Sequence, residues 1–173
     1  MSDRIFEIKV FVPNEKSLDV INYIQSPRFP MFFQPTTDDH FQYCHTFMAR
    51  HDEFLPKEGR VNSEYFPFAK MVFDDFCGQH GIEYKTILRM AFNCTFHSVD
   101  LPDVHTDHEF PHKVLLMYLN DCGGETLVYN EAGDIKHRVK PEKYKCVYFS
   151  GEPHNNLSPE KDVRRMVFVA TFI

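Results

Sequence analysis

The second half of the chain is divided into short apolar or alternating segments, and this pattern constrains the fold most. Six segments are expected to be strands, at 86–94, 113–119, 125–130, 135–140, 145–149 and 164–173. Turn-forming residues stand between them, at Pro102-Asp103, Asn120-Asp121, Gly123-Gly124, Ala132-Gly133, Pro141 and Gly151. Short strands at this spacing are typical of an all-β sandwich or barrel.

The first half adds helices to this β-rich pattern. The expected elements are a strand at 5–12, helices at 15–25 and 63–78, and one or two short strands around 41–49. Ser63 is the expected N-cap of the second helix and Gly78 its C-terminal stop. The sequence therefore predicts a mainly β protein with N-terminal helices, folded as a jelly roll, that is, a cupin-like double-stranded β-helix.

The chain length of 173 residues fits one domain, in which residues 1–85 supply helices and supporting strands and residues 86–173 form the jelly-roll core. A formal net charge of -6 makes nucleic acid an unlikely partner, because a basic face supplies most of the affinity for it. Five well-spread cysteines with no CxxC pair argue against a disulfide framework. The sequence shows neither a secretory leader nor an apolar run that could span a membrane, so a soluble cytoplasmic protein is expected.

A His-x-Asp tripeptide stands just before the expected strand at 113–119. Side chains at i and i+2 of an extended segment point the same way, so His105 and Asp107 can share a metal ion. His154, which follows a strand end and a turn, can supply a third ligand. Two imidazoles and one carboxylate leave three positions of an octahedral ion open, as in non-haem Fe(II) oxygenases. The tripeptide by itself is short enough to occur by chance in a surface loop.

Two adjacent arginines open the last expected strand. Arg164 and Arg165 stand ten and eleven residues beyond His154. An arginine at the start of a buried strand needs an anionic partner, because an unpaired buried charge is costly. A dicarboxylate cosubstrate can be that partner through a bidentate fork, and strand alternation lets only one of the two point inward. The alternative is a pair of solvated arginines at a strand end.

The order of these features resembles the prolyl-4-hydroxylase-like branch of the 2-oxoglutarate/Fe(II) oxygenases, and more closely the small oxygenases of marine phages and related bacteria. The matching segments are HTDHEFPHKVLLMYLNDCGGETLVYNEAG and YFSGEPHNNLSPEKDVRRMVFVATF, and the resemblance covers about residues 86–173. It implies that His105, Asp107 and His154 hold Fe(II). It also implies that 2-oxoglutarate and O₂ are cosubstrates, with ascorbate as a candidate reductant.

The resemblance further implies which residues hold 2-oxoglutarate. Pro159 aligns with a proline common in the closest relatives and selects Arg165 as the partner of the distal carboxylate. Tyr118 stands where a tyrosine of this branch often donates its hydroxyl to the same carboxylate, although a core tyrosine is the alternative. Asn93 and Arg89 could each reach the cosubstrate or the substrate, or form structural hydrogen bonds.

The implied reaction is hydroxylation of a small-molecule or peptide substrate, with a peptidyl proline as the first candidate by analogy. Three other functions stay open: a cupin-type iron or manganese enzyme that does not use 2-oxoglutarate, a non-enzymatic β-sandwich binding module, and an oxygenase acting on a nucleobase or nucleotide. His105, His108 and His112 could instead form a zinc site, although no fourth ligand stands at a recognisable spacing. The loop before His105 and the segment 50–62 are expected to form the lip of the substrate pocket.

Overall fold

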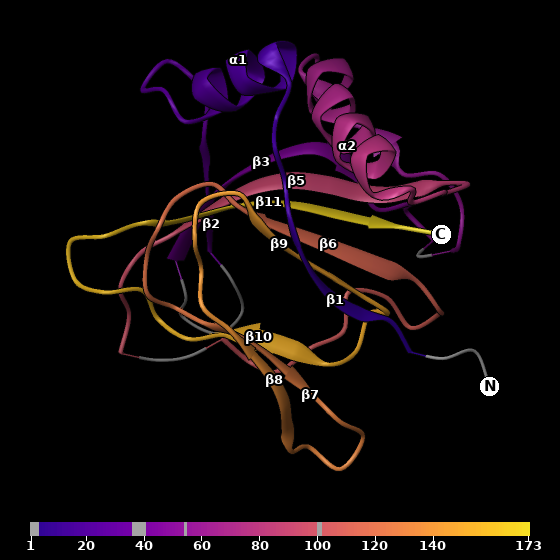
Figure 1. The fold of residues 1–173 in the computed structure, drawn as a ribbon, viewed down its shortest axis with the longest axis vertical. Coiled ribbons are helices and arrows are strands. Elements are labelled where there is room, and N and C mark those ends of the chain that lie inside the picture. Colours follow the sequence, from indigo (N-terminus) through magenta and orange to yellow (C-terminus); the bar gives the residue numbers. More distant parts are fainter. Residues whose placement is uncertain (1–3, 36–40, 54, 100–101) are drawn as a thin grey trace.

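The computed structural model describes residues 4–35, 41–53, 55–99 and 102–173, and within them two helices and eleven strands (Figure 1). In chain order these are β1 Phe6–Val10, α1 Glu15–Ile24, β2 Phe32–Pro35, β3 Phe41–Ala49, β4 Arg60–Val61, α2 Phe66–His80, β5 Ile87–Thr95, β6 Lys113–Tyr118, β7 Thr126–Tyr129, β8 Ile135–Val139, β9 Lys145–Phe149, β10 His154–Asn156 and β11 Arg165–Phe172. The predicted mainly β architecture with N-terminal helices is confirmed.

The strands form two antiparallel sheets. The main sheet has the order β1-β9-β6-β11-β5-β3-β2, with β4 paired to β3, and the small sheet has the order β10-β7-β8. Figure 1 shows α1 and α2 above the main sheet and the small sheet below it. The arrangement is consistent with a jelly roll, which is built from two sheets. Segments from both halves of the chain contribute strands to the main sheet.

Alternation along β11 divides the interior into two cores. The helix-facing side chains of this strand are Met166, Phe168, Ala170 and Phe172, which join the larger core under α1 and α2. Val167 and Val169 point the other way, into a smaller core shared with β6, β7 and β9. All eight residues of β11 are buried, because this strand lies between β5 and β6 and is covered on both faces.

The two predicted boundaries of α2 were wrong. Gly78 lies inside the helix, which ends at His80, and Gly81 forms the C-cap with φ 63° and its N–H bonded to Cys77 O. That left-handed conformation favours glycine, so the later of the two glycines is the stop. At the other end Tyr65 is the N-cap, and Ser63 stands outside the helix, where its Oγ accepts a hydrogen bond from Tyr65 N at 3.1 Å.

Other expectations agree with the structure more closely. The six C-terminal strands and the first strand and helix are present at the expected places, and the segment around 41–49 is one nine-residue strand. β2, β4 and β10 were not predicted, because two to four residues carry too little alternation to be recognised. All five cysteines are free and buried. Within the described parts of the chain, no helix is long and apolar enough to cross a membrane.

Candidate metal centre and cosubstrate site

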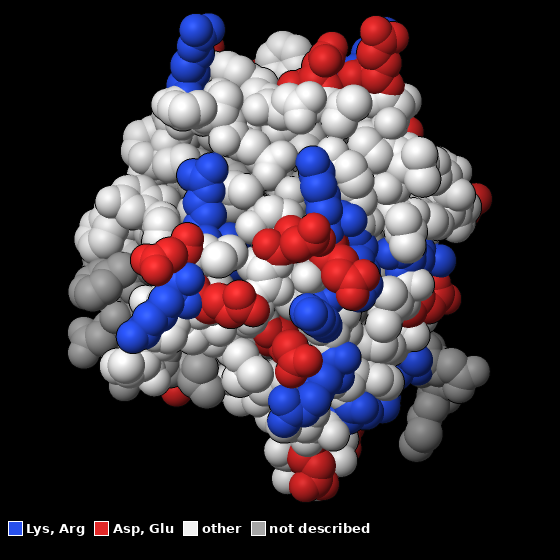
Figure 2. Space-filling view, turned by 60° about the vertical axis from the view of Figure 1, so that its left-hand side comes forward, with Lys and Arg blue, Asp and Glu red and all other residues white. Residues whose placement is uncertain are grey.

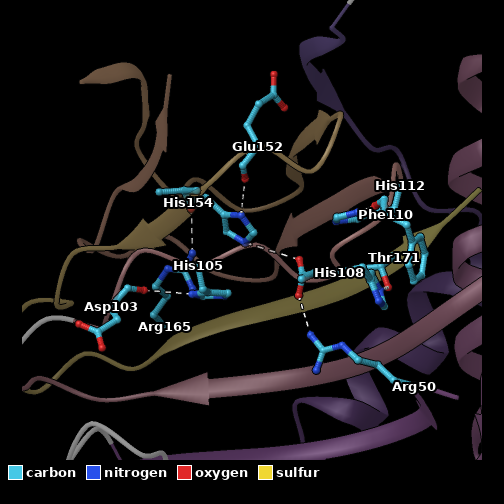
Figure 3. Close-up of polar contacts among 12 residues, drawn as sticks. Arg50, Asp103, His105, His108, Phe110, His112, Glu152, His154, Arg165 and Thr171 are labelled. Atoms are coloured by element: carbon cyan, nitrogen blue, oxygen red, sulfur yellow. Dashed lines mark hydrogen bonds and ion pairs between the residues drawn. The ribbon is translucent and has the colours of Figure 1, made fainter. Parts of the chain in front are cut away.

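The backbone joins the two predicted histidine ligands directly. His105 and His154 form an isolated antiparallel bridge in which His105 N donates to His154 O at 3.1 Å and His154 N donates to His105 O at 2.9 Å. This bridge ties the segment before β6 to the start of β10 (Figure 3). The two imidazoles are consequently neighbours, with ring centroids 4.8 Å apart.

Asp107 completes a cluster of three metal-binding side chains. One ligand atom from each of His105, Asp107 and His154 lies within 4.8 Å of the others, and no other such group of three or more occurs in the described residues. The Asp107 and His154 side chains are buried, whereas His105 is exposed on the cleft side of the bridge. The predicted same-side placement of His105 and Asp107 is therefore present.

The hydrogen bonds of both imidazoles leave the metal-binding nitrogen free. Nδ1 of His105 lies 3.0 Å from Asp103 O, and Nδ1 of His154 lies 2.9 Å from Glu152 O (Figure 3). A carbonyl oxygen only accepts, so each Nδ1 carries a proton, and in the neutral tautomer with that proton Nε2 has the lone pair that can bind a metal. Burial lowers the pKa of His154 although the Asp107 charge opposes it, which favours the neutral imidazole that a metal ion needs.

The Asp107 carboxylate has one oxygen that lacks a hydrogen-bond donor. Its Oδ1 accepts from Arg50 Nη2 at 3.0 Å, whereas Oδ2 is buried without a hydrogen bond, 3.6 Å from His154 Nε2. An unpaired buried carboxylate oxygen is costly, and a cation between Asp107 and the two imidazoles would remove that cost. The donor set and its unpaired atoms therefore fit a divalent metal ion.

Arg50 is a site residue that the sequence did not indicate. Its guanidinium comes from the end of β3, 57 residues before the carboxylate it binds, and no motif marks it. Burial alone would raise the pKa of Asp107, but His154, Arg89, Arg50 and His105 outweigh it and hold the pKa below its ordinary value. The carboxylate is thus kept ionised, as a metal ligand must be.

Arg165 is buried in the wall of the same cleft, whereas Arg164 is exposed. The Arg165 guanidinium donates from Nε to Gly124 O at 3.1 Å and from Nη2 to Thr126 Oγ1 at 2.9 Å. It also lies over the Tyr118 ring, 5.5 Å from the centroid. All of these partners are neutral, and no carboxylate of the described residues forms an ion pair with Arg165. Of the two arginines that the sequence left in competition, it is Arg165 that points inward.

Tyr118 and Asn93 lie differently with respect to the cleft. The Tyr118 hydroxyl donates to Thr126 Oγ1 at 2.7 Å, behind the cleft wall, so that Tyr118 acts on the cleft through Thr126 and Arg165. Asn93 lines the cleft itself, and its buried Oδ1 has no hydrogen-bond partner. Thr126 was missed, because a threonine in a short strand carries no signal of its own.

A cavity of about 1280 Å³ is lined by the three metal-binding side chains and by Arg50, Asn93, Thr126 and Arg165. The loop before the triad lines its mouth at 96–98 and 102–103, as predicted, whereas Arg50 is the lining residue among those described in the segment 50–62. Phe33 and Tyr43, from β2 and β3, also line the mouth and were not expected there.

The alternative zinc site is not formed. His108 is bonded through Nε2 to Thr171 Oγ1 at 2.9 Å, and His112 through Nδ1 to Phe110 O at 2.8 Å. Neither imidazole belongs to the metal-binding cluster of the described residues. The geometry thus does not support the alternative in which His105 shares an ion with these two histidines.

No protein-family profile matches the chain. No curated protein matches it either. Solved structures do match. An oxidoreductase of the 2OG-Fe(II) oxygenase family from Burkholderia pseudomallei superposes with TM-score 0.70 at 14% identity, covering 96% of this chain and 85% of its own. The chain has the fold of the 2-oxoglutarate/Fe(II) oxygenases.

Two prolyl hydroxylases share this fold. One, from Pseudomonas putida, is a prolyl-4-hydroxylase with TM-score 0.60 at 12% identity, covering 99% of this chain and 94% of its own. The other, from Trichoplax adhaerens, has TM-score 0.62 at 16% identity, covering 97% of this chain and 83% of its own. That enzyme is in complex with a peptide fragment of the hypoxia inducible factor oxygen degradation domain.

Proposed function

We propose that the protein is an Fe(II)- and 2-oxoglutarate-dependent oxygenase that hydroxylates its substrate. The observation that carries the proposal is the combination, in one cleft, of an incomplete metal cluster and a buried arginine with no carboxylate partner. His105, Asp107 and His154 supply two free imidazole nitrogens and an unpaired carboxylate oxygen. Arg165 supplies the cation that a dicarboxylate requires.

The chain's own residues have separate tasks in this proposal. The triad holds Fe(II) from one side and leaves the other side to small ligands. When bound, Fe(II) with 2-oxoglutarate and O₂ supplies the oxidation, in which 2-oxoglutarate becomes succinate and CO₂ and one oxygen atom enters a substrate C–H bond. Arg165 holds the distal carboxylate of 2-oxoglutarate, Thr126 and Tyr118 fix the guanidinium, and Asn93 contacts the bound cosubstrate from β5.

Arg165 favours this proposal over a metal enzyme that does not use 2-oxoglutarate. Such an enzyme keeps the triad but has no use for a buried guanidinium without a counter-charge, which is costly to maintain. A binding module with no metal explains neither the buried arginine nor the unpaired Asp107 oxygen. Both features have a purpose once a metal ion and a dicarboxylate are bound.

The finer parts of the proposal concern substrate and setting. A peptidyl proline is the first substrate to test, because two of the similar structures are prolyl hydroxylases. Kinship with the small oxygenases of marine phages and an intracellular location, in a host cytoplasm if phage-encoded, belong to the same proposal. Five free, buried cysteines fit a reducing compartment.

The test is an anaerobic titration of Fe(II)-loaded protein with 2-oxoglutarate, followed by the visible charge-transfer band of a chelated 2-oxo acid. Wild-type protein should develop the band, and His154→Ala should not. Arg165→Ala should need about 100-fold more 2-oxoglutarate, because a buried charge-assisted interaction is lost. Arg164→Ala, which removes an exposed arginine one residue away, is the matched control and should titrate like wild type.

Each failure has a separate meaning. Iron binding without a band in the wild-type protein would exclude 2-oxoglutarate and support the other metal-enzyme class. A wild-type protein that binds no iron would remove the oxygenase assignment altogether. Weakened binding in Arg164→Ala with normal binding in Arg165→Ala would reverse the assignment of the anchor.

A further inference from the structure

A second arginine whose side chain forms no ion pair with the described residues lies in the cleft, away from Arg165. Arg89 of β5 pairs in register with Thr171 of β11, whereas Arg165 pairs with Thr95. The two arginines therefore stand six positions apart along the sheet, or roughly 20 Å between their backbones. Both side chains line the same cavity. The cleft thus has two cationic regions, and the proposed cosubstrate accounts for one of them.

The Arg89 side chain makes no hydrogen bond and no ion pair with any described residue, although the residue is only partly exposed. Its neighbour Arg50 is already bonded to Asp107 at 3.0 Å. The Arg50 and Arg89 side chains line the same cavity as Asp107. Of these two arginines, Arg50 is bonded to the Asp107 carboxylate and Arg89 is not.

The excess positive charge is local to the cleft. On the outer face seen in Figure 2, acidic and basic side chains are interspersed, and the chain as a whole is acidic, with a formal net charge of -6. A metal ion at the triad would add positive charge beside Asp107, and a dicarboxylate bound to Arg165 would offset it at the far side of the site. Low-dielectric walls strengthen the field that remains and attract a further anion.

We propose that Arg89 is the substrate-recognition residue of this cleft and that the substrate carries an anionic group, a carboxylate or a phosphate, which Arg89 binds on the Asp107 side of the metal. This inference rests on the proposed function, because it treats the Arg165 side as the cosubstrate site. A guanidinium fork binds carboxylate and phosphate oxygens equally well in geometry. The carbon that is oxidised is then placed between the bound anion and the triad.

The experiment uses Mn(II) in place of Fe(II), so that the protein binds ligands without turnover. With 2-oxoglutarate saturating, inorganic phosphate and ¹³C-labelled acetate are titrated in separate arms, and paramagnetic relaxation of ³¹P or ¹³C reports binding near the metal. Acetamide serves as the neutral analogue of acetate. The affinity for 2-oxoglutarate is measured on the same samples by calorimetry.

Wild-type protein should show saturable relaxation of at least one of the two anions and none of acetamide. Arg89→Gln should weaken that binding by about tenfold or more while the affinity for 2-oxoglutarate changes by less than about twofold. Arg138→Gln is the matched control, since it removes one exposed arginine from β8, outside the cleft lining. The anion that binds more tightly identifies whether the substrate group is a carboxylate or a phosphate.

Several results would overturn the inference. Equal anion relaxation in Arg89→Gln and wild type would mean that the anion binds the metal alone, and no relaxation in wild type would mean that the region takes no anion. Loss of 2-oxoglutarate affinity in Arg89→Gln would place Arg89 in the cosubstrate site. If wild type binds neither Mn(II) nor 2-oxoglutarate, the proposed function fails separately, and calorimetry of phosphate and acetate with the metal-free protein still decides whether Arg89 holds an anion.

Discussion

The two faces of the main sheet are built from the same strands but have opposite chemistry. On the helix-covered face, Phe73 and Phe172 are fully buried and pack edge-to-face with ring centroids 5.0 Å apart. On the cleft face, Arg89 is unpaired and Asn93 and Thr95 each keep a buried polar atom without a partner. Each strand supplies both faces, because neighbouring side chains point in opposite directions.

This difference indicates how the fold tolerates a cleft that contains buried polar atoms without hydrogen-bond partners. Buried polar atoms without partners destabilise the folded chain, and groups of like charge in one cleft repel each other. The aromatic core under the helices stabilises the fold enough to offset that cost. Substitutions on the helix-covered face should therefore change stability, whereas substitutions on the cleft face should change ligand binding.

The largest effect is expected from Phe73→Ala on the helix-covered face. Loss of a fully buried aromatic ring should lower the free energy of unfolding by about 3–5 kcal/mol, measured by denaturant titration. Phe68→Ala on the same helix is the control, because Phe68 is 53% exposed and its loss should cost less than about 1 kcal/mol. Equal costs for the two variants would contradict the assignment of α2's buried face.

Gly124→Ala should lower both the stability of the fold and the affinity for 2-oxoglutarate. Gly124 has φ 81°, and an added Cβ would lie 2.7 Å from Leu157 O and 3.2 Å from Arg165 Cδ. We expect a loss of about 2–4 kcal/mol in unfolding free energy and weaker 2-oxoglutarate binding, because the Arg165 side chain must move.

Gly133→Ala separates the cost of the left-handed backbone from the effect of displacing Arg165. Gly133 also has positive φ, at 86°, but an added Cβ there meets nothing within 4 Å. Its substitution should cost only about 1–2 kcal/mol, the penalty for the left-handed backbone, and leave cosubstrate binding unchanged. A normal cosubstrate affinity in Gly124→Ala would show that Arg165 tolerates displacement.

Arg50→Gln should weaken metal binding with little effect on stability. The variant removes the donor that orients Asp107, and loss of such a supporting contact typically lowers metal affinity about 10- to 100-fold. Anaerobic Fe(II) or Mn(II) titration measures the change. Arg60→Gln is the control, because Arg60 and its partner Asp52 are both exposed and neither belongs to the cluster. Unchanged affinity in Arg50→Gln would mean that Asp107 holds its position unaided.

The smallest effect is expected at His45, on the helix-covered face. Burial lowers the pKa of His45, whose ring is bonded to Pro30 O and Ser63 Oγ. The unfolded chain therefore binds protons more readily than the folded one, and the unfolding free energy should fall as the pH drops below about 6.5. His45→Gln should show a smaller fall between about pH 7 and pH 5 in denaturant titrations. An identical fall would assign the acid sensitivity to other histidines.

Features that depend on neighbouring residues could be predicted from the sequence, whereas contacts between distant segments could not. The alternating pattern predicted β11 and a single inward arginine, the family resemblance selected Arg165 through Pro159, and the order of His105, Asp107 and His154 indicated the cluster. Arg50 could not be found, because its contact with the carboxylate spans 57 residues and follows no pattern.

Short elements escaped prediction for a different reason. β10 contains three residues, two of them asparagine, and its pairing with β7 is a tertiary property rather than a local preference. The end of α2 was misplaced because Gly78 and Gly81 are equally good stops until the left-handed turn is seen. The unpaired state of Arg89 likewise depends on which side chains the fold brings near it.

The central position of β11 has a consequence for how the protein is made. The last strand of the chain fills the gap between β5 and β6, so both neighbours present open hydrogen-bonding edges until it arrives. During translation these edges stay unpaired until residues 165–172 have emerged from the ribosome, and a bound chaperone would protect them from aggregation in that interval. A chain truncated just upstream of Arg165 would keep most of the aromatic side chains that face the helices. It would lack the strand that joins β5 to β6.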